Sequence, residues 1–273
     1  MDLPTQRPQE QWDTGPAYDQ YVGRWSRKVA SAFVEWLAVA PGKRWLDIGC
    51  GTGALSLAIA ELASPELLIG RDTSKGYISH AKERVVGITR SVFVVADARA
   101  LPFPGAAFDA IVSGLALNFV PSFDQLAALV AMRRAVRPGG VVAAYVWDYA
   151  GQMQFMRYFW DAAVALDPAA QPLDQGMRFR ICDPEALTAL FQDAGLTSVE
   201  IRPIDVPTLF RDFDDFWAPF LGGQGSAPGY VRSLPEHHRI KLRDHLRAVL
   251  PAAPDGSIPL VARAWAIRGF RGV

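Results

Sequence analysis

Hydrophobic and polar residues change their spacing several times along the first half of the chain. Short runs rich in Val, Ile and Leu alternate with stretches whose apolar residues recur at helical spacing. The runs predict strands at 44–49, 66–72, 91–97, 108–117 and 141–148, and the stretches predict helices ending near 39 and at 53–63, 74–85 and 123–136. Apolar strands separated by helices are typical of a parallel sheet that is covered on both faces. The pattern therefore predicts a doubly wound α/β fold.

After residue 150 the alternation becomes less regular. Residues 152–166 predict an aromatic-rich helix, and 183–195 predict a helix with Asp183 as its N-cap. The last two predicted strands, 197–206 and 257–270, are separated by a long helical and glycine-containing stretch. Within it, "GGQGSAPG" at 222–229 predicts a mobile loop, since no Lys-Ser/Thr follows to make a phosphate loop.

The length, composition and charge of the chain limit the classes of protein to which it can belong. It has 273 residues, of which 50% are hydrophobic, so we expect a flexible tail at 1–15 and a single domain over 16–273. Lys and Arg together number 28, as do Asp and Glu, so we expect no nucleic-acid partner. Two distant cysteines predict neither a disulfide framework nor a metal site. No apolar run is long enough to span a bilayer and the N-terminus lacks a signal peptide, so we expect a cytoplasmic protein.

Three glycines separate the first predicted strand from the helix that follows it. Gly49, Gly51 and Gly53 lie in "RWLDIGCGTGALSLAIA", where glycine costs backbone entropy. A turn of this kind lets a ligand approach the backbone, and the next helix offers free N–H groups. Because ligands of open parallel sheets bind beyond the carboxyl ends of the strands, we expect a binding site here.

Acidic residues end three successive predicted strands. Asp47 ends the first, Asp72 the second and Asp97 the third. A single Asp at such a position is ordinary, since it can cap a helix or be solvated. Three of them at one edge of a parallel sheet favour a ligand with an amine and hydroxyl groups.

These stretches resemble the class I S-adenosylmethionine (SAM)-dependent methyltransferases, of the group that includes small-molecule and quinone-biosynthesis enzymes. "LDIGCGTG" is similar to the first motif of that family and "GRDTS" to the second. "ADARALPFPGAAFDAIVSGLALNFVP" resembles the third and fourth motifs, and "RRAVRPGG" resembles the segment before the fifth strand. The resemblance covers about residues 44–148. It implies a Rossmann-like, mostly parallel seven-stranded sheet whose last strand is antiparallel.

The resemblance also implies which residues bind the cofactor SAM, whose product is S-adenosylhomocysteine (SAH). Asp47 and the turn from Gly49 to Gly53 would hold the methionine part, Asp72 the ribose, and Asp97 with the Ala98 backbone the adenine. The full set of implied cofactor-binding residues is Arg24, Asp47, Gly49, Cys50, Gly51, Gly53, Asp72, Thr73, Asp97, Ala98, Ser113 and Leu115. Arg24, with Tyr21 less secure, would contact the SAM carboxylate; a purely structural role for its helix stays open.

Several roles stay open at this stage. Arg71 either covers the adenine or points to solvent, and Asn118 either orients a substrate or caps a turn. Asp148 is a weak candidate for a catalytic base, and a solvated acid at the end of a strand is the simpler interpretation. His237 and His238 lie in a charged amphipathic helix and are interpreted as surface residues.

Two segments leave the predicted reactive edge and are rich in aromatic residues. We expect 149–182 and 208–257 to form a helical lid over a small acceptor of apolar or aromatic character. The alternative is that their rings only pack these segments onto the domain. Two other functions stay open: a SAM-binding sensor or scaffold without catalysis, and an NAD(P)-binding protein, because "GCGTGA" also satisfies a relaxed dinucleotide fingerprint.

Overall fold

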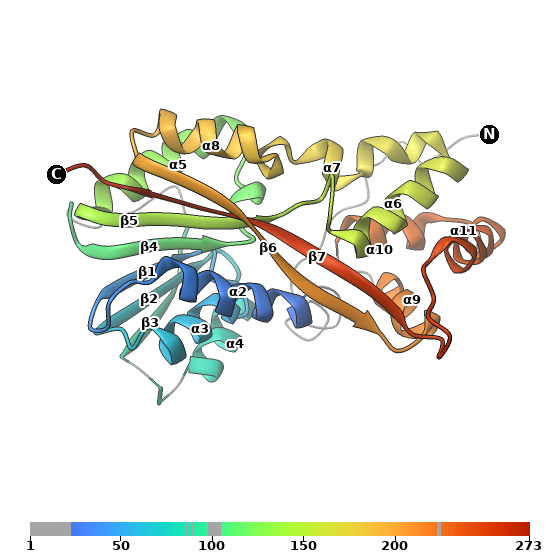
Figure 1. The fold of residues 1–273 in the computed structure, drawn as a ribbon, viewed down its shortest axis with the longest axis horizontal. Coiled ribbons are helices and arrows are strands. Elements are labelled where there is room, and N and C mark those ends of the chain that lie inside the picture. The colour runs from blue at the N-terminus through green and yellow to red at the C-terminus, as the bar shows by residue number, and fades with distance from the viewer. Residues whose placement is uncertain (1–22, 86, 89, 98–104, 223–224) are drawn as a thin grey trace.

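The structure, a computed structural model, describes residues 23–85, 87–88, 90–97, 105–222 and 225–273. The predicted tail at 1–15, Tyr21 and Ala98 lie outside these residues. Within them, seven strands form one sheet in the order β3-β2-β1-β4-β5-β7-β6. The predicted α/β architecture is confirmed (Figure 1).

Parallel strands connected by helices make up the first half. The strands are β1 Arg44–Ile48, β2 Leu67–Asp72, β3 Ser91–Val95, β4 Phe108–Gly114 and β5 Val136–Trp147. The helices are α2 Arg24–Leu37, α3 Ala54–Leu62, α4 Lys75–Val85 and α5 Ser122–Ala135. β4 ends earlier than predicted, and a short 3₁₀ turn, η2 Leu117–Phe119, follows it. β1, β4 and β5 bury their apolar side chains between the helical layers, which explains their continuous hydrophobic runs. The edge strand β3 buries Phe93 but leaves Val92, Val94 and Val95 exposed.

The last two strands complete the sheet. β7 Ile258–Phe270 is antiparallel to both β5 and β6 Thr197–Phe210, which confirms the antiparallel last strand. Helices α5 and α8 Pro184–Asp193 cover one face of the sheet, and α2, α3 and α4 cover the other (Figure 1). Asp183 accepts hydrogen bonds from the N–H groups of Glu185 and Ala186, as expected for the N-cap of α8.

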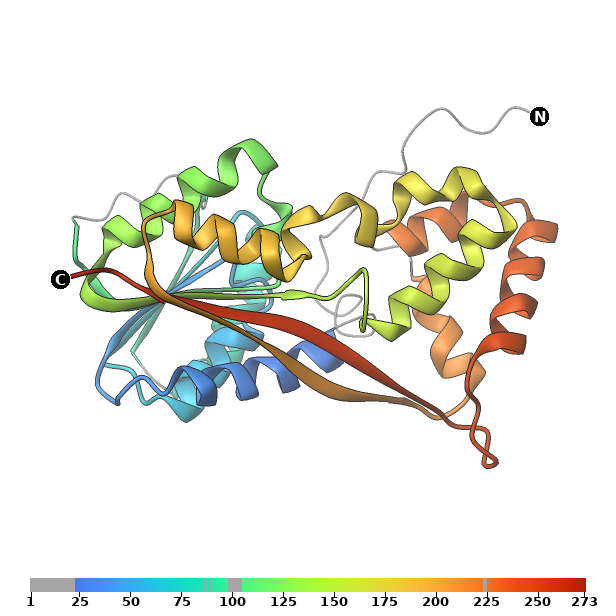
Figure 2. The same cartoon turned by 45° about the horizontal axis from the view of Figure 1, so that its top comes forward.

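β6 and β7 continue well beyond the other strands and carry a second body of helices (Figure 2). We call this the helical lobe; it comprises α6 Gln154–Leu166, α9 Phe213–Leu221, α10 Ser226–Ser233 and α11 Glu236–Val249. Short elements connect α6 to α8: η3 Pro168–Leu173, α7 Gln175–Arg178 and η4 Arg180–Cys182. Two expectations are corrected here. β6 runs to Phe210 rather than ending near Val206, and residues 226–229 of the predicted loop are helical.

Aromatic rings form the interior of the helical lobe. Phe155, Phe159, Phe216 and Phe220 are fully buried, and the rings of Phe159 and Phe220 stack with their centroids 4.4 Å apart. These rings come from both predicted lid segments and pack against one another across α6, α9 and the end of β6. They therefore act as the core of the lobe, in agreement with the alternative that these rings serve packing.

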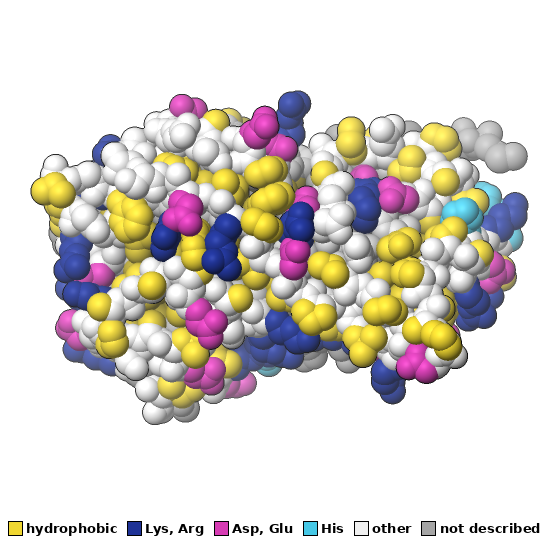
Figure 3. All heavy atoms as spheres, in the orientation of Figure 1, with side chains coloured by type: hydrophobic (Ala, Val, Ile, Leu, Met, Phe, Trp, Pro, Cys, Tyr) yellow, Lys and Arg dark blue, Asp and Glu magenta, His cyan; other side chains and the backbone are white. Residues whose placement is uncertain are grey.

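The molecular surface carries mixed charge. On the face shown in Figure 3, Lys and Arg side chains are interspersed with Asp and Glu over both parts of the molecule. No helix among the described residues is both long enough and apolar enough to cross a membrane.

Candidate functional site

A cavity of about 450 Å³ lies at the edge of the sheet where the parallel strands end. Residues that follow β1, β2, β3, β4 and β5 all contribute to its lining, together with Ser26 of α2. The lining residues on the β2 and β3 side include Asp72, Thr73, Tyr77 and Asp97, and those on the β5 side include Tyr145, Trp147 and Tyr149. The strand order sets these two groups at opposite ends of the cavity.

The three glycines of the turn serve different purposes. Gly49, Gly51 and Gly53 all have positive φ, at 70°, 53° and 86°. A Cβ on Gly49 would overlap the Cβ of Ala116, and one on Gly53 would lie 3.0 Å from the Cα of Ala81. A Cβ on Gly51 would meet nothing within 4 Å, and Gly51 lines the cavity. Two glycines therefore let the chain pack closely on itself, and the third leaves space for a ligand.

Hydrogen bonds from β2 hold this turn in place. The N–H groups of Gly49 and Cys50 both donate to the carbonyl of Arg71, at 2.8 and 3.0 Å. The N–H of Gly51 donates to one carboxylate oxygen of Asp72 at 3.0 Å, and the N–H of Ser74 donates to the other at 2.8 Å. Asp72 thus organises both loops while it faces the cavity.

Asp47 lies behind the turn and is fully buried. Its Oδ2 accepts a hydrogen bond of 2.6 Å from Ser56 of α3, and its Oδ1 has no partner among the described residues. Burial raises the pKa of Asp47 to about 7, and the charge of Asp72 adds to this while the Ser56 hydrogen bond opposes it. Asp47 is not among the residues that line the cavity, so it supports the turn from beneath.

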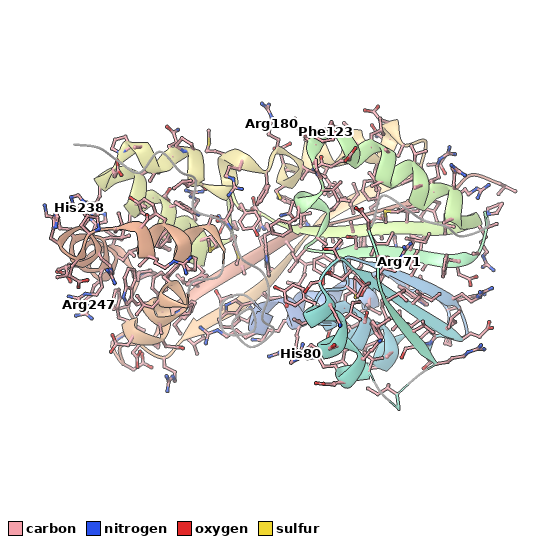
Figure 4. All side chains as sticks on the ribbon, turned by 180° about the vertical axis from the view of Figure 1, so that it is seen from behind. Arg71, His80, Phe123, Arg180, His238 and Arg247 are labelled. Carbon is pink, nitrogen blue, oxygen red and sulfur yellow. The ribbon has the colours of Figure 1, made fainter. Side chains whose placement is uncertain are left out.

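Two neighbours of these groups are also buried. Arg71 is only 6% exposed, which excludes the alternative that its side chain points to solvent. Figure 4 shows Arg71 in the sheet-bearing part of the molecule. Burial lowers the pKa of Arg71, and the negative charge of Asp97 opposes that shift. Burial also raises the pKa of the Cys50 thiol, so this cavity-lining cysteine is a neutral, weakly reactive group.

The end of β4 supplies the two other predicted lining residues. Ser113 is buried, and its Oγ has no hydrogen-bond partner within the described part of the chain. Leu115 has a φ of 57°, which is unusual for a residue other than glycine, and its N–H donates to the carbonyl of Tyr145 at 2.8 Å. Strained backbone and an unsatisfied buried hydroxyl at one cavity are features of a binding site.

Comparisons with known proteins agree with this geometry. Residues 46–140 match a family model described as a methyltransferase domain. A demethylmenaquinone methyltransferase from Staphylococcus aureus (strain JH9) is 28% identical over 177 residues, which cover 61% of this chain and 73% of that protein. The domain match and this relative support a class I SAM-dependent methyltransferase.

Solved structures share the fold of this methyltransferase. A putative methyltransferase from Bacillus halodurans C-125 superposes with a TM-score of 0.60 at 12% identity, covering 90% of this chain and all of that one. A Haemonchus contortus phosphoethanolamine N-methyltransferase 2, in complex with phosphomonomethylethanolamine and SAH, gives a TM-score of 0.59 at 16% identity. That match covers 94% of this chain and 57% of the other.

The cofactor of the methyltransferase is SAM, and the cavity suits it. The open space at Gly51, the unpartnered Oγ of Ser113 and the two carboxylates of Asp72 and Asp97 offer room and polar groups in one place. Most of the residues predicted to bind SAM line this cavity: Gly49, Cys50, Gly51, Asp72, Thr73, Asp97, Ser113 and Leu115.

Arg24 lies elsewhere in the methyltransferase. Its Nη1 is 3.2 Å from the Oδ1 of Asp215 in α9, and its guanidinium lies over the rings of Trp25 and Phe210. Arg24 does not line the cavity; from the same helix, only Ser26 does. In this structure, Arg24 therefore joins the sheet-bearing part of the molecule to the helical lobe.

Asp148 also lies outside the cavity lining, and it makes hydrogen bonds within a turn. Its Oδ2 accepts a hydrogen bond of 2.8 Å from the N–H of Gln152, and its carbonyl accepts one from Met153 at 2.9 Å. A Cβ on Gly151 would lie 2.6 Å from Oδ2, so a larger residue there would displace the Asp148 carboxylate. A structural role in the turn accounts for Asp148 better than that of a base.

The remaining candidates contribute little to the site. Asn118 is buried in η2 but does not line the cavity, and its Nδ2 has no partner in the described part of the chain. His237 and His238 lie exposed on α11. Across the described ranges, no cluster of three His, Cys, Asp or Glu side chains could hold a metal ion.

Sequence reasoning did not assign several aromatic residues that line the cavity. Phe119 lies in the 3₁₀ turn after β4, Tyr145 and Trp147 are among the last three residues of β5, and Tyr149 follows that strand. A sequence signal existed for Phe119 and Trp147, which fall within or beside the strand-end motifs. Tyr145 lies inside an apolar strand, where its pattern is that of a core residue.

Proposed function

We propose that this methyltransferase binds SAM along the turn from Gly49 to Gly53 and methylates a small acceptor of apolar or aromatic character. The acceptor lies at the β5 end of the same cavity. The single observation that carries the proposal is the division of the cavity lining: the carboxylates and the glycine turn lie at one end, with Tyr77 as the aromatic residue there, and Phe119, Tyr145, Trp147 and Tyr149 lie at the other.

The cofactor end is supported by the positions of its polar groups. The Asp72 carboxylate accepts two backbone N–H bonds and keeps lone pairs for the two ribose hydroxyls. Asp97 is proposed for the adenine amino group, with Thr73 beside it, and the Ser113 hydroxyl and Leu115 for the methionine part. Asp47 contributes indirectly, because its contact is with Ser56 behind the turn.

The acceptor end is supported by the residues beyond β4 and β5. Phe119, Tyr145, Trp147 and Tyr149 line the cavity there, and Trp147 is almost fully buried. Side chains of this kind favour a flat, apolar ligand and exclude water. The S. aureus relative is named a demethylmenaquinone methyltransferase, and a quinone acceptor supports this character.

SAM supplies an electrophilic methyl group, so the chain need not build a reactive group of its own. Its residues hold the two ligands in line and exclude water from the space between them. The carboxylates among the described lining residues are Asp72 and Asp97, and both belong to the cofactor end. We therefore assign positioning, rather than proton transfer, as the task of the Asp72 and Asp97 carboxylates.

The lid role of 149–182 and 208–257 stays a prediction within this proposal, as does a single domain over 16–273. Of these two segments, Tyr149 alone contributes to the described lining of the cavity. The buried rings of both segments support a lobe with its own rigid core.

The test uses the full chain, methyl-labelled SAM and fractionated metabolite extracts. We expect SAH to form and the label to enter an apolar product, and we expect calorimetry to show binding of SAM and SAH but not of NADH. SAM binding without turnover in any fraction would favour the sensor or scaffold alternative. NADH binding without SAM binding would contradict the proposal as a whole.

A further inference from the structure

Three aromatic rings meet at the acceptor end of the cavity, and only two of them line it. Phe179 packs edge-on against Phe119, with centroids 5.5 Å apart and planes at 74°. It also contacts Tyr149, with centroids 5.7 Å apart and planes at 46°. Phe119 and Tyr149 line the cavity, and Phe179 stands behind both.

These rings come from three separate segments. Phe119 belongs to η2 after β4, Tyr149 follows β5, and Phe179 lies between α7 and η4. Phe179 therefore bridges the segments that leave the ends of two neighbouring strands. Phe119 is 46% exposed, so this bridge lies where the cavity meets the surface. Figure 4 shows Phe123 and Arg180, each a few residues from this contact, at one edge of the molecule.

A partly buried ion pair fixes the segment that carries Phe179. Arg157 of α6 donates to the Oδ2 of Asp174 at 2.6 Å and also to the carbonyl of Tyr149 at 3.0 Å. Asp174 caps α7 by accepting from the N–H of Gly176 at 2.8 Å, and the N–H of Phe179 donates to the carbonyl of Gln175 at 3.0 Å. One guanidinium thus ties the backbone of Tyr149 to the short helix before Phe179.

We infer that Phe179 is a positioning residue that holds the rings of Phe119 and Tyr149 so that the cavity receives a planar aromatic ring. The inference rests on the proposed function, because it assumes that the acceptor occupies the β5 end. Aromatic pairs prefer edge-to-face and offset arrangements, so a ring at position 179 sets the orientation of its neighbours. An aliphatic side chain of similar volume fills the space but does not impose that orientation.

The experiment measures binding of 2-naphthol and of its saturated analogue, decahydro-2-naphthol, to the SAH-saturated protein by calorimetry. The wild type, Phe179→Tyr and Phe179→Leu are compared. We expect the wild type and Phe179→Tyr to prefer the aromatic probe, because both keep a ring and the half-buried position allows the added hydroxyl to reach water. We expect Phe179→Leu to bind 2-naphthol about three- to tenfold more weakly and to lose the preference.

Phe213→Leu is the matched control. Phe213 is also half-buried, and it contacts the rings of Phe216 and Trp217. An arginine guanidinium lies over each of the two compared rings: that of Arg247 is 4.4 Å from the Phe213 centroid, and that of Arg178 is 5.2 Å from the Phe179 centroid. Phe213 lies in the helical lobe, away from the cavity lining, so we expect no change in the binding of either probe.

The outcomes separate this inference from the proposed function. If Phe179→Leu keeps the wild-type preference, or if the wild type binds neither probe or shows no preference, the inference is wrong. SAH binding and methyl transfer from SAM to an extract fraction test the proposed function without reference to position 179. Equal SAH affinity in all variants is expected, and weaker SAH binding by Phe179→Leu would indicate a general structural defect and overturn the assignment.

Discussion

The backbone N–H of Gly51 donates a hydrogen bond of 3.0 Å to the carboxylate of Asp72. This bond joins the turn after β1 to the end of β2, and the other Asp72 oxygen accepts from Ser74. The residue proposed to bind the ribose therefore also fixes the turn proposed to bind the methionine part. Binding and local order at this edge of the sheet are coupled through one side chain.

Asp72→Ala is expected to weaken SAM binding by about 1–3 kcal/mol, the usual cost of removing a charged hydrogen-bond partner. Because two backbone N–H groups lose their acceptor, the free energy of unfolding should also fall by about 1–2 kcal/mol. Asp183→Ala is the matched control, since its carboxylate also accepts two backbone N–H bonds but caps α8 away from the cavity. Calorimetry should show normal SAM affinity for Asp183→Ala; equal losses in both variants would refute a specific role of Asp72.

Gly51→Ala is expected to abolish or strongly weaken SAM binding while it lowers stability by about 1 kcal/mol through backbone strain. Gly42→Ala provides the comparison, because Gly42 also has positive φ, at 72°, and open space at the Cβ position, but lies outside the cavity lining. Both variants should lose similar stability in urea unfolding. Tight SAM binding by Gly51→Ala would show that no ligand approaches this backbone.

The buried Asp47 predicts a pH-dependent stability. Its pKa is about 7 in the folded protein against 3.8 for the unperturbed group, so the folded chain holds a proton that the unfolded chain releases between these values. The free energy of unfolding therefore falls as pH rises from about 4 to about 7 and levels off above. Asp47→Asn removes this contribution, so its stability relative to wild type should rise over that range by about 4 kcal/mol at most. Denaturant unfolding of both proteins at intervals from pH 4.5 to 8 measures the difference, and a constant difference would contradict the prediction.

The Arg24–Asp215 pair is expected to contribute to stability rather than to cofactor binding. Its side chains are 28% and 18% exposed, so a double-mutant cycle with Arg24→Ala and Asp215→Asn should give a coupling of about 0.5–1 kcal/mol. SAM affinity should change less than about twofold in either variant. A large loss of SAM affinity in Arg24→Ala alone would instead support the contact with the SAM carboxylate that the family resemblance implies.

Much of the cofactor end follows from local sequence patterns. The alternation of apolar strands with helices predicts the parallel sheet, and the ends of parallel strands necessarily meet at one edge. Gly51, Asp72, Asp97 and Ser113 could be assigned to one cavity for this reason, before any side-chain contact was known. The sequence shows that 149–182 and 208–257 are rich in aromatic residues, but the burial of these rings against one another could not be read from spacing alone.

Contacts between distant segments are what the tertiary structure decided. Arg24 and Asp215 are 191 positions apart, and an arginine in an amphipathic helix carries no local signal of its partner. The same holds for Phe179, which contacts Phe119 and Tyr149 from a segment with no regular period. Asp148 ends a strand as the site acids do, yet its carboxylate accepts a hydrogen bond from the backbone of the tight turn that follows. The sequence by itself determined the sheet and the edge where we propose that SAM binds, because hydrophobic period and strand direction are local properties. The acceptor end depends on side chains brought together by the packing of β5, η2 and α7, which only the complete fold specifies.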